Sequence, residues 1–146
     1  MSIEKIVKEC KEVLVIITGG EPCMHKNLEL LVYTLQADGH YVAIETNGTL
    51  PTPCNANWVT ASPKPGANYL IHPECKYNEL KFVVTEELNF TEDVAPLLEK
   101  GVPVWLQPNG YDLQDSAREA YRYVMSMNKY GNLKLGIQMH KIYDFR

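Results

Sequence analysis

The sequence predicts an α/β fold: a mostly parallel sheet of about five to six strands with crossover helices, in one domain spanning residues 1–146. Two observations lead to this prediction. Short apolar runs alternate with amphipathic stretches along the chain, and strands separated by helices are joined by right-handed crossovers that make neighbouring strands parallel. The chain has 146 residues, 45% of them hydrophobic, which suffices for the core of one domain.

The first predicted strand covers residues 13–17, a continuous apolar run closed by a Gly-Gly pair and typical of a strand buried on both faces. Leucine and valine then recur at spacings i, i+3, i+4 and i+7 in residues 28–35, which predicts a helix that ends at Gly39. Residues 41–46 and 58–62 form the second and third predicted strands, each followed by turn-forming residues.

The second half of the chain repeats this alternation. Residues 79–85 form the fourth predicted strand, and a helix over residues 89–100 carries acidic residues in its first turn. The fifth strand covers residues 102–106. A longer helix over residues 114–130 is expected to bury Ala117, Tyr121, Val124 and Met125. Residues 133–138 form the last predicted strand. The sequence contains no internal repeat, low-complexity tract or linker, in agreement with one domain.

Composition argues against several classes of function. Charged residues make up 22% of the chain, the net charge is −4, and no Lys/Arg run is present, so nucleic acid is not an expected partner. No apolar stretch approaches the roughly 18 residues needed to span a bilayer, so no membrane is expected either. The first residues do not resemble a secretory signal, and the expected location is the cytoplasm.

The four cysteines are far apart in the sequence, at Cys10, Cys23, Cys54 and Cys75. None forms a C-x-x-C pair or has a histidine at metal-ligand spacing, so the residues predict no metal site. Disulfides are rare in cytoplasmic proteins, and the four are expected to be free thiols.

Five polar turns follow predicted strands, at residues 18–22, 45–48, 62–65, 107–109 and 138–141. Ligands of parallel α/β folds bind at the carboxyl ends of the strands, where these turns are expected to converge. The paired glycines of the first turn let a ligand approach the backbone closely. Gly, Pro and Asn also favour plain tight turns anywhere, but the accompanying Thr, Glu, Ser, Lys, Gln and His favour a binding rim.

Other catalytic signatures are missing from the sequence. The glycine pair lacks the G-x-G-x-x-G spacing of a dinucleotide fold and the G-K-[ST] of a P-loop. No G-x-S-x-G elbow is present, and the ligand motifs of zinc deaminases are missing.

The turns together resemble the 7-carboxy-7-deazaguanine synthase family of the radical S-adenosylmethionine enzymes, which acts in queuosine and 7-deazapurine biosynthesis. The residues that carry the resemblance are 15–22 (Val-Ile-Ile-Thr-Gly-Gly-Glu-Pro), 44–49 (Ile-Glu-Thr-Asn-Gly-Thr), 62–65 (Ser-Pro-Lys-Pro), 79–81 (Glu-Leu-Lys) and 138–141 (Gln-Met-His-Lys). Gly-Gly-Glu-Pro marks only the superfamily, and the other motifs point to the synthase. The resemblance covers essentially the whole chain but about the C-terminal two-thirds of the family pattern, and it implies a partial (β/α)6 barrel.

The resemblance implies a lyase that acts on 6-carboxy-5,6,7,8-tetrahydropterin, abstracting hydrogen, contracting the ring and releasing ammonia with the help of Mg²⁺. The residues it assigns to S-adenosylmethionine are Gly19, Gly20, Glu21, Ser62, Pro63, Lys64, Gln107, Pro108, Asn109 and Gly110. The residues it assigns to the pterin substrate are Thr18, Glu45 and Arg146.

One part of the family pattern has no counterpart in these residues. The family holds a [4Fe–4S] cluster with three closely grouped cysteines upstream of Gly-Gly-Glu-Pro, whereas here only Cys10 precedes the first predicted strand. Cluster ligation needs thiolates at close local spacing, which the other cysteines do not supply. The isolated chain is therefore expected to be inactive, with the family's upstream substrate and Mg²⁺ contacts also lacking.

In the complete family fold the first predicted strand is interior, so here it is expected to be an exposed apolar edge that invites pairing with another chain. A homodimer, or a complex with a separate chain that carries the cluster, is the expected assembly. A helix over residues 2–11 is expected to cover part of this edge.

Three interpretations stay open at this point. The chain is a piece of a genuine synthase, a non-catalytic module of the same fold that binds S-adenosylmethionine or a purine, or an unrelated α/β protein whose turns match by chance. The sequence alone does not fix the exact substrate or the oligomeric state.

Overall fold

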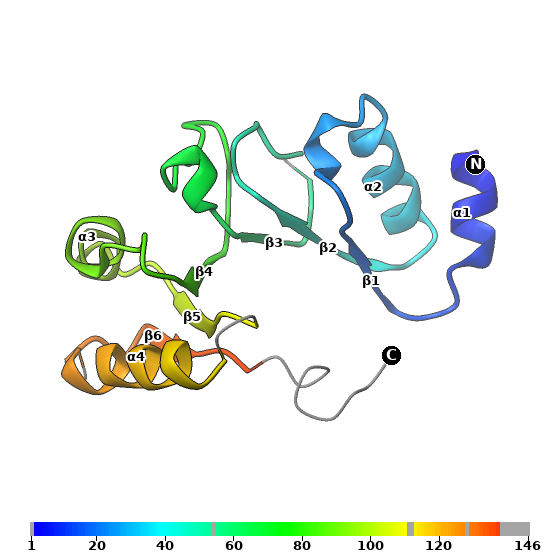
Figure 1. The fold of residues 1–146 in the computed structure, drawn as a ribbon. Helices are drawn as coiled ribbons and strands as arrows, with labels where there is room; N and C mark the ends of the chain where they lie inside the picture. The colour runs from blue at the N-terminus through cyan, green and yellow to red at the C-terminus, as the bar shows by residue number, and fades with distance from the viewer. Residues whose placement is uncertain (1, 54, 111–112, 128, 138–146) are drawn as a thin grey trace. The chain divides into compact units, whose positions relative to one another are not determined.

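The computed structural model describes residues 2–53, 55–110, 113–127 and 129–137. The chain divides into two compact units (Figure 1). Unit 1 comprises Met1–Ala61 and Leu70–Asn78, and unit 2 comprises Ser62–Tyr69 and Glu79–Arg146. Six strands lie in the described residues, and every strand pairing within the units is parallel. The predicted α/β class and strand number are confirmed, while the single domain and the partial barrel stay predictions.

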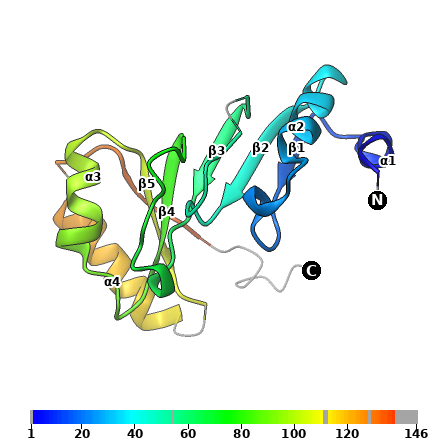
Figure 2. The same cartoon turned by 90° about the horizontal axis from the view of Figure 1, so that it is seen from above.

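Unit 1 contains three strands, two α-helices and one short 3-10 turn. In chain order the elements of unit 1 are α1 (Ile3–Glu9), β1 (Leu14–Ile17), η1 (Pro22–Met24), α2 (Leu28–Ala37), β2 (Tyr41–Thr46) and β3 (Trp58–Ala61). Strand β2 lies between β1 and β3, with Leu14 opposite Tyr41 and Ala43 opposite Trp58. Figures 1 and 2 both show α1 beside α2, on the side of unit 1 away from β3.

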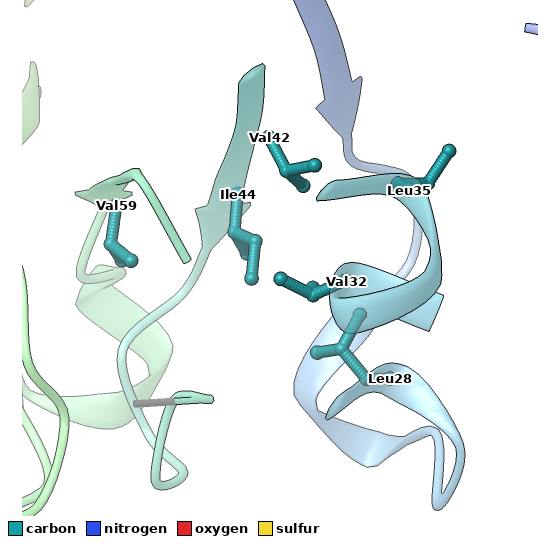
Figure 3. Close-up of a cluster of buried hydrophobic side chains, with 6 residues drawn as sticks. All are labelled: Leu28, Val32, Leu35, Val42, Ile44 and Val59. Atoms are coloured by element: carbon teal, nitrogen blue, oxygen red, sulfur yellow. The ribbon is translucent and has the colours of Figure 1, made fainter. Parts of the chain in front are cut away.

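The core of unit 1 lies between α2 and one face of the three strands (Figure 3). Its six buried side chains are Leu28, Val32 and Leu35 from α2, Val42 and Ile44 from β2, and Val59 from β3. The helix supplies positions i, i+4 and i+7 and the strand positions i and i+2, which are the periodicities of one helix face and one sheet face. Figure 3 shows Val32 directed toward Ile44. This packing fixes the carboxyl ends of β1 and β2, from which the polar turns leave.

The other face of the same strands is open within unit 1. Leu14 and Ile16 of β1 are 51% and 54% exposed, and Tyr41 and Trp58 on the neighbouring strands are also exposed. The prediction that residues 13–17 are buried on both faces is therefore wrong, because in unit 1 the helices cover one face only. The predicted dimer or cluster-bearing partner at β1 stays a prediction.

Unit 2 contains the other three strands and two α-helices. Its elements are η2 (Pro65–Ala67), β4 (Glu79–Val84), a π-helical turn η3 (Phe90–Val94), α3 (Ala95–Glu99), β5 (Val104–Pro108), α4 (Leu113–Ser126) and β6 (Leu133–Leu135). Strand β5 pairs with both β4 and β6. Helix α4 packs against β5.

The predicted helices of unit 2 form with two differences. Residues 89–100 are not one regular helix: a π turn precedes α3, and Pro96 stands in the first turn of α3, since proline has no N–H to donate inside a continuous helix. The face of α4 that is buried contains Ser116 and Ala120, whereas Tyr121 and Met125 are each 55% exposed. The periodicity predicted the helix but placed its apolar face about one position too far around the axis.

Among the residues that the structure describes, no helix is both long enough and apolar enough to cross a membrane.

Two leucines of α2 test how strongly the unit 1 core stabilises the chain. Leu35 is fully buried and Leu30 is 55% exposed on the same helix. We expect Leu35→Ala to lower the free energy of unfolding by about 2 to 5 kcal/mol, because it removes buried methyl groups and leaves a cavity. The matched Leu30→Ala is expected to change it by less than about 0.5 kcal/mol. Urea unfolding followed by circular dichroism measures both, and equal losses would contradict the placement of the core.

Candidate functional site

The turn that follows β1 presents bare backbone. Gly19 and Gly20 have φ angles of +92° and +54°, in the left-handed region that favours glycine. A Cβ built on either residue meets no other atom within 4 Å, so the outer side of the turn is open. Thr18, Gly19 and Gly20 are all exposed at the end of the strand. The peptide groups of this turn are therefore accessible to a ligand.

The carboxylate of Glu21 joins this turn to the end of β2. Its Oε1 accepts hydrogen bonds from the Thr46 hydroxyl at 2.6 Å and from the Cys23 amide at 3.0 Å. Its Oε2 accepts a hydrogen bond from the Asn47 amide at 2.7 Å. The bond to Cys23 also caps the short helical turn η1. One side chain thus holds two turns that are 25 residues apart in the sequence.

These contacts keep Glu21 ionised. Burial alone would raise the pKa of its carboxyl group, but the hydrogen bonds from Thr46, Asn47 and Cys23 outweigh burial and hold the pKa below its ordinary value. The pKa values of the two neighbouring thiols, Cys23 and Cys75, are raised instead. Burial, with the Glu21 carboxylate beside it, raises the pKa of the Cys23 thiol to about 11, and burial and Glu21 also raise the pKa of Cys75. Both thiols are therefore neutral near pH 7.

The turn after β2 is ordered by its own side chains. The Oδ1 of Asn47 accepts hydrogen bonds from the amide of Thr49 at 2.8 Å and from its hydroxyl at 2.6 Å. Gly48 is buried with φ of +79°, and a Cβ there would lie 3.4 Å from the Cβ of Ala61. Asn47 therefore stabilises the turn through its side chain, and Gly48 allows both the positive φ and the close approach of Ala61. Glu45, which was assigned to substrate, is exposed one residue before Thr46.

A cavity of about 450 Å³ lies beside the first turn, within unit 1. Its polar lining includes Thr18, Gly19, His25 and Asn27, and apolar side chains of α1 and α2 complete it. Sequence patterns did not predict this cavity, because it depends on how α1 packs beside α2.

The other residues assigned to S-adenosylmethionine lie in unit 2. Ser62 and Pro63 are buried, and the Lys64 ammonium donates a hydrogen bond to the Ser62 hydroxyl at 2.9 Å. At the end of β5, the Asn109 amide donates to the Ser116 hydroxyl at 2.9 Å, which ties this turn to α4. The remaining three are Gln107 and Gly110, which are partly buried, and Pro108, which is buried.

Within unit 1 the structure brings together Thr18, Gly19, Gly20 and Glu21 with the end of β2. The convergence of these residues with Ser62–Lys64 and residues 107–110 of unit 2 stays a prediction. Residues 138–141 and Arg146 lie outside the described residues.

Two residues that the assignments missed are Thr46 and Asn47, which are the partners of Glu21. In the sequence, Thr46 is a polar residue at the end of a predicted strand, and Asn47 begins the Asn-Gly turn that follows it.

The described part of the chain contains no group of three or more His, Cys, Asp or Glu side chains that could hold a metal ion. Cys10, Cys23 and Cys75 are free thiols. Cluster ligation requires grouped thiolates, and these cysteines are neither grouped nor, for Cys23 and Cys75, easily ionised. The described residues therefore do not fit an iron–sulfur cluster.

Comparisons with known proteins lead to one kind of enzyme. No protein-family model matches the chain. The chain is 31% identical over 141 residues to 7-carboxy-7-deazaguanine synthase from Synechocystis sp., a match that covers 93% of this chain and 64% of that relative. It is 32% identical over 162 residues to the synthase of the same name from Aquifex aeolicus, a match that covers 100% of this chain and 73% of the relative.

A solved structure shows the same likeness. The crystal structure of QueE from Escherichia coli matches with a TM-score of 0.72 and 29% sequence identity, over 94% of this chain and 64% of that one. The chain thus spans slightly less than two thirds of the length of the Synechocystis relative and of the Escherichia coli protein.

Replacing Glu21 by glutamine tests whether its charge orders the two turns. Because the pKa of Glu21 is lower in the folded chain than its ordinary value of 4.5, the ionised group stabilises the fold above that value. This stabilisation is lost as the pH falls through the lowered pKa. We expect Glu21→Gln to lower the free energy of unfolding by about 1 to 2 kcal/mol at pH 7, and the difference from the parent chain to shrink below pH 4.5.

Urea unfolding at a series of pH values measures this difference. Glu9→Gln, at a side chain that is 60% exposed, is the control, and it is expected to change the unfolding free energy at pH 7 by less than about 0.5 kcal/mol. A Glu21→Gln effect that stays constant down to pH 3 is the result that contradicts the charge-dependent role.

Proposed function

The chain belongs to the 7-carboxy-7-deazaguanine synthase family, and on this premise we propose that it acts in 7-deazapurine and queuosine biosynthesis on 6-carboxy-5,6,7,8-tetrahydropterin, with S-adenosylmethionine bound at the Gly19–Gly20 turn. The interpretation as an unrelated α/β protein is wrong, because the family membership excludes it. The open question is whether these 146 residues carry out the reaction or only bind its ligands.

The observation that carries the proposal is the turn after β1. Its glycines are exposed and carry no side chain, with open space where a Cβ would stand, and Glu21 holds the turn against β2. Peptide carbonyls accept hydrogen bonds from an ammonium group, so this turn suits the amino end of the methionine moiety. In the family, S-adenosylmethionine supplies the 5′-deoxyadenosyl group.

The neighbouring groups have complementary roles in this proposal. Thr18, exposed at the mouth of the cavity of about 450 Å³, offers a hydroxyl to the pterin. Glu45 supplies a carboxylate that accepts hydrogen bonds from a ring N–H or an amino group. Ser62, Pro63 and Lys64 serve the ribose and carboxylate side of S-adenosylmethionine, and residues 107–110 serve its adenosine.

The described cysteines do not fit the iron–sulfur cluster of the family. We propose that these 146 residues bind ligand but do not turn it over unless a cluster-bearing segment is supplied. The alternative is a module of the same fold that only binds S-adenosylmethionine or a purine. The two proposals differ in one expected outcome. Adding a separate chain that carries the cluster restores turnover under the first proposal but not under the alternative.

Calorimetry with S-adenosylmethionine tests the binding site. The parent chain is expected to bind, and Gly19→Ala to weaken binding by at least about tenfold, because alanine disfavours a φ of +92° and adds a methyl group to the ligand side. Gly39→Ala is the matched control. It has φ of +94° at the turn between α2 and β2, so it suffers the same backbone strain away from the site and is expected to bind as the parent does. Absence of binding to the parent chain rejects the proposed function.

Anaerobic reconstitution with iron and sulfide tests the proposed lack of turnover. We expect the 146-residue chain to acquire no visible absorbance of a cluster and to form no 5′-deoxyadenosine from S-adenosylmethionine under reducing conditions. A family member that carries the three grouped cysteines, treated in parallel, is the positive control for the reconstitution. Formation of 5′-deoxyadenosine by the chain alone refutes the proposal.

A further inference from the structure

The hydroxyl group of Thr46 uses its whole hydrogen-bonding capacity. Thr46 ends β2, and the residue is only 4% exposed. Its Oγ1 lies 2.6 Å from Oε1 of Glu21, 3.1 Å from the amide nitrogen of Gly48 and 3.6 Å from Sγ of Cys23. A hydroxyl has one proton to donate and two lone pairs to accept with, so these three contacts saturate it.

The chemistry of the three partners fixes the direction of each bond. The Gly48 amide can only donate, and the ionised Glu21 carboxylate can only accept. The Cys23 thiol keeps its proton near neutral pH and donates to Thr46. The hydroxyl proton of Thr46 therefore goes to Glu21, in the shortest of the three contacts. The bonds run from Gly48 and Cys23 through Thr46 to Glu21.

The hydrogen bonds of Glu21 also affect the glycine turn, which comprises Thr18, Gly19 and Gly20 after β1. Glu21 follows Gly20 directly, and the three described hydrogen bonds of its carboxylate come from the Thr46 hydroxyl and from the amides of Cys23 and Asn47. Gly19 and Gly20 are exposed, and a Cβ added to either would meet no atom within 4 Å, so no side chain packs against that side of the turn. The conformation that it presents to a ligand thus depends on how firmly Glu21 is held.

We propose that Thr46 is a positioning residue for the ligand-binding turn and acts through Glu21. The inference rests on the proposed function, in which Gly19 and Gly20 hold the methionine end of S-adenosylmethionine. Thr46 itself touches no ligand in this proposal. Its hydroxyl holds the Glu21 carboxylate, and the carboxylate holds the turn.

Two substitutions at Thr46 separate the hydroxyl from the rest of the side chain. Thr46→Val keeps the branched shape and removes the hydroxyl, which leaves Gly48 without an acceptor and Glu21 without its shortest bond. Thr46→Ser keeps the hydroxyl. We expect Thr46→Val to weaken S-adenosylmethionine binding by about tenfold in calorimetry and Thr46→Ser by no more than about twofold. Thr46→Ala is the second hydroxyl-free variant, with the same expected loss, should the valine variant fold poorly.

Thr52→Val is the matched control in unit 1. The Thr52 hydroxyl also makes two backbone contacts, at 3.0 Å to the Lys76 carbonyl and 2.9 Å from the Lys76 amide, but neither involves the turn after β1. This variant is expected to bind S-adenosylmethionine within about twofold of the parent chain.

A double-mutant cycle distinguishes action through Glu21 from a general loss of structure. If Thr46 acts through Glu21, Thr46→Val lowers the affinity of the parent chain but has little further effect in a Glu21→Gln background. Additive losses in the two backgrounds overturn the proposal, and so does a Thr46→Val chain that binds as the parent does.

Amide hydrogen exchange gives a readout that needs no ligand. Thr46→Val is expected to speed exchange of the Cys23 and Asn47 amides, which both donate to Glu21, while Thr52→Val leaves them unchanged. Should the parent chain not bind S-adenosylmethionine, the proposed function fails, and this exchange measurement still decides whether Thr46 holds Glu21. Unchanged exchange of both amides in Thr46→Val rejects the positioning role.

Discussion

The carboxylate of Glu21 accepts hydrogen bonds from two turns, and the geometry of both depends on its remaining charged in a half-buried place. A carboxylate loses hydration when it is buried, and it stays ionised only where fixed donors replace the lost water. Here the donors are two amides and one hydroxyl. They are available because β1 and β2 are parallel neighbours, so that both strands end at the same edge of the sheet. The parallel pairing of β1 and β2 thus brings the hydrogen-bond donors to Glu21, and the ionised carboxylate of Glu21 orders the turns that follow the two strands.

The same dependence links the core of unit 1 to its surface. Val42 and Ile44 are buried against α2, so the alternation along β2 leads on to the buried Thr46, with Glu45 exposed between them. A shift of one residue in the register would exchange their places and turn the Thr46 hydroxyl away from Glu21. Packing of apolar side chains thus decides where a single hydroxyl points. The conformation of the turn after β1 therefore depends partly on the hydrophobic core.

Sequence patterns predicted the elements of this fold well where one periodicity dominated. The i, i+3, i+4, i+7 spacing predicted α2 and the apolar runs predicted the strands, because each signal is local. The exposure of Leu14 and Ile16 was missed, since an apolar run does not reveal whether a second layer covers it. The break before α3 was missed because Pro96 was interpreted as lying near the start of a helix over residues 89–100, whereas it stands in the first turn of the shorter α3. For the site, the Gly-Gly-Glu-Pro motif identified the turn, but Thr46 was missed because its role exists only through a partner 25 residues away.

The charge that orders the turns also limits the chemistry near them. Cys23 lies within the same network, where burial and, after it, the neighbouring Glu21 carboxylate raise the pKa of the thiol to about 11. Its S–H then donates to Thr46, which frees the threonine proton for Glu21. Soft metal ions and clusters need thiolates, and ionising Cys23 would break this chain of donors at its start. The hydrogen bonds that hold the turn in place thus disfavour metal ligation at Cys23.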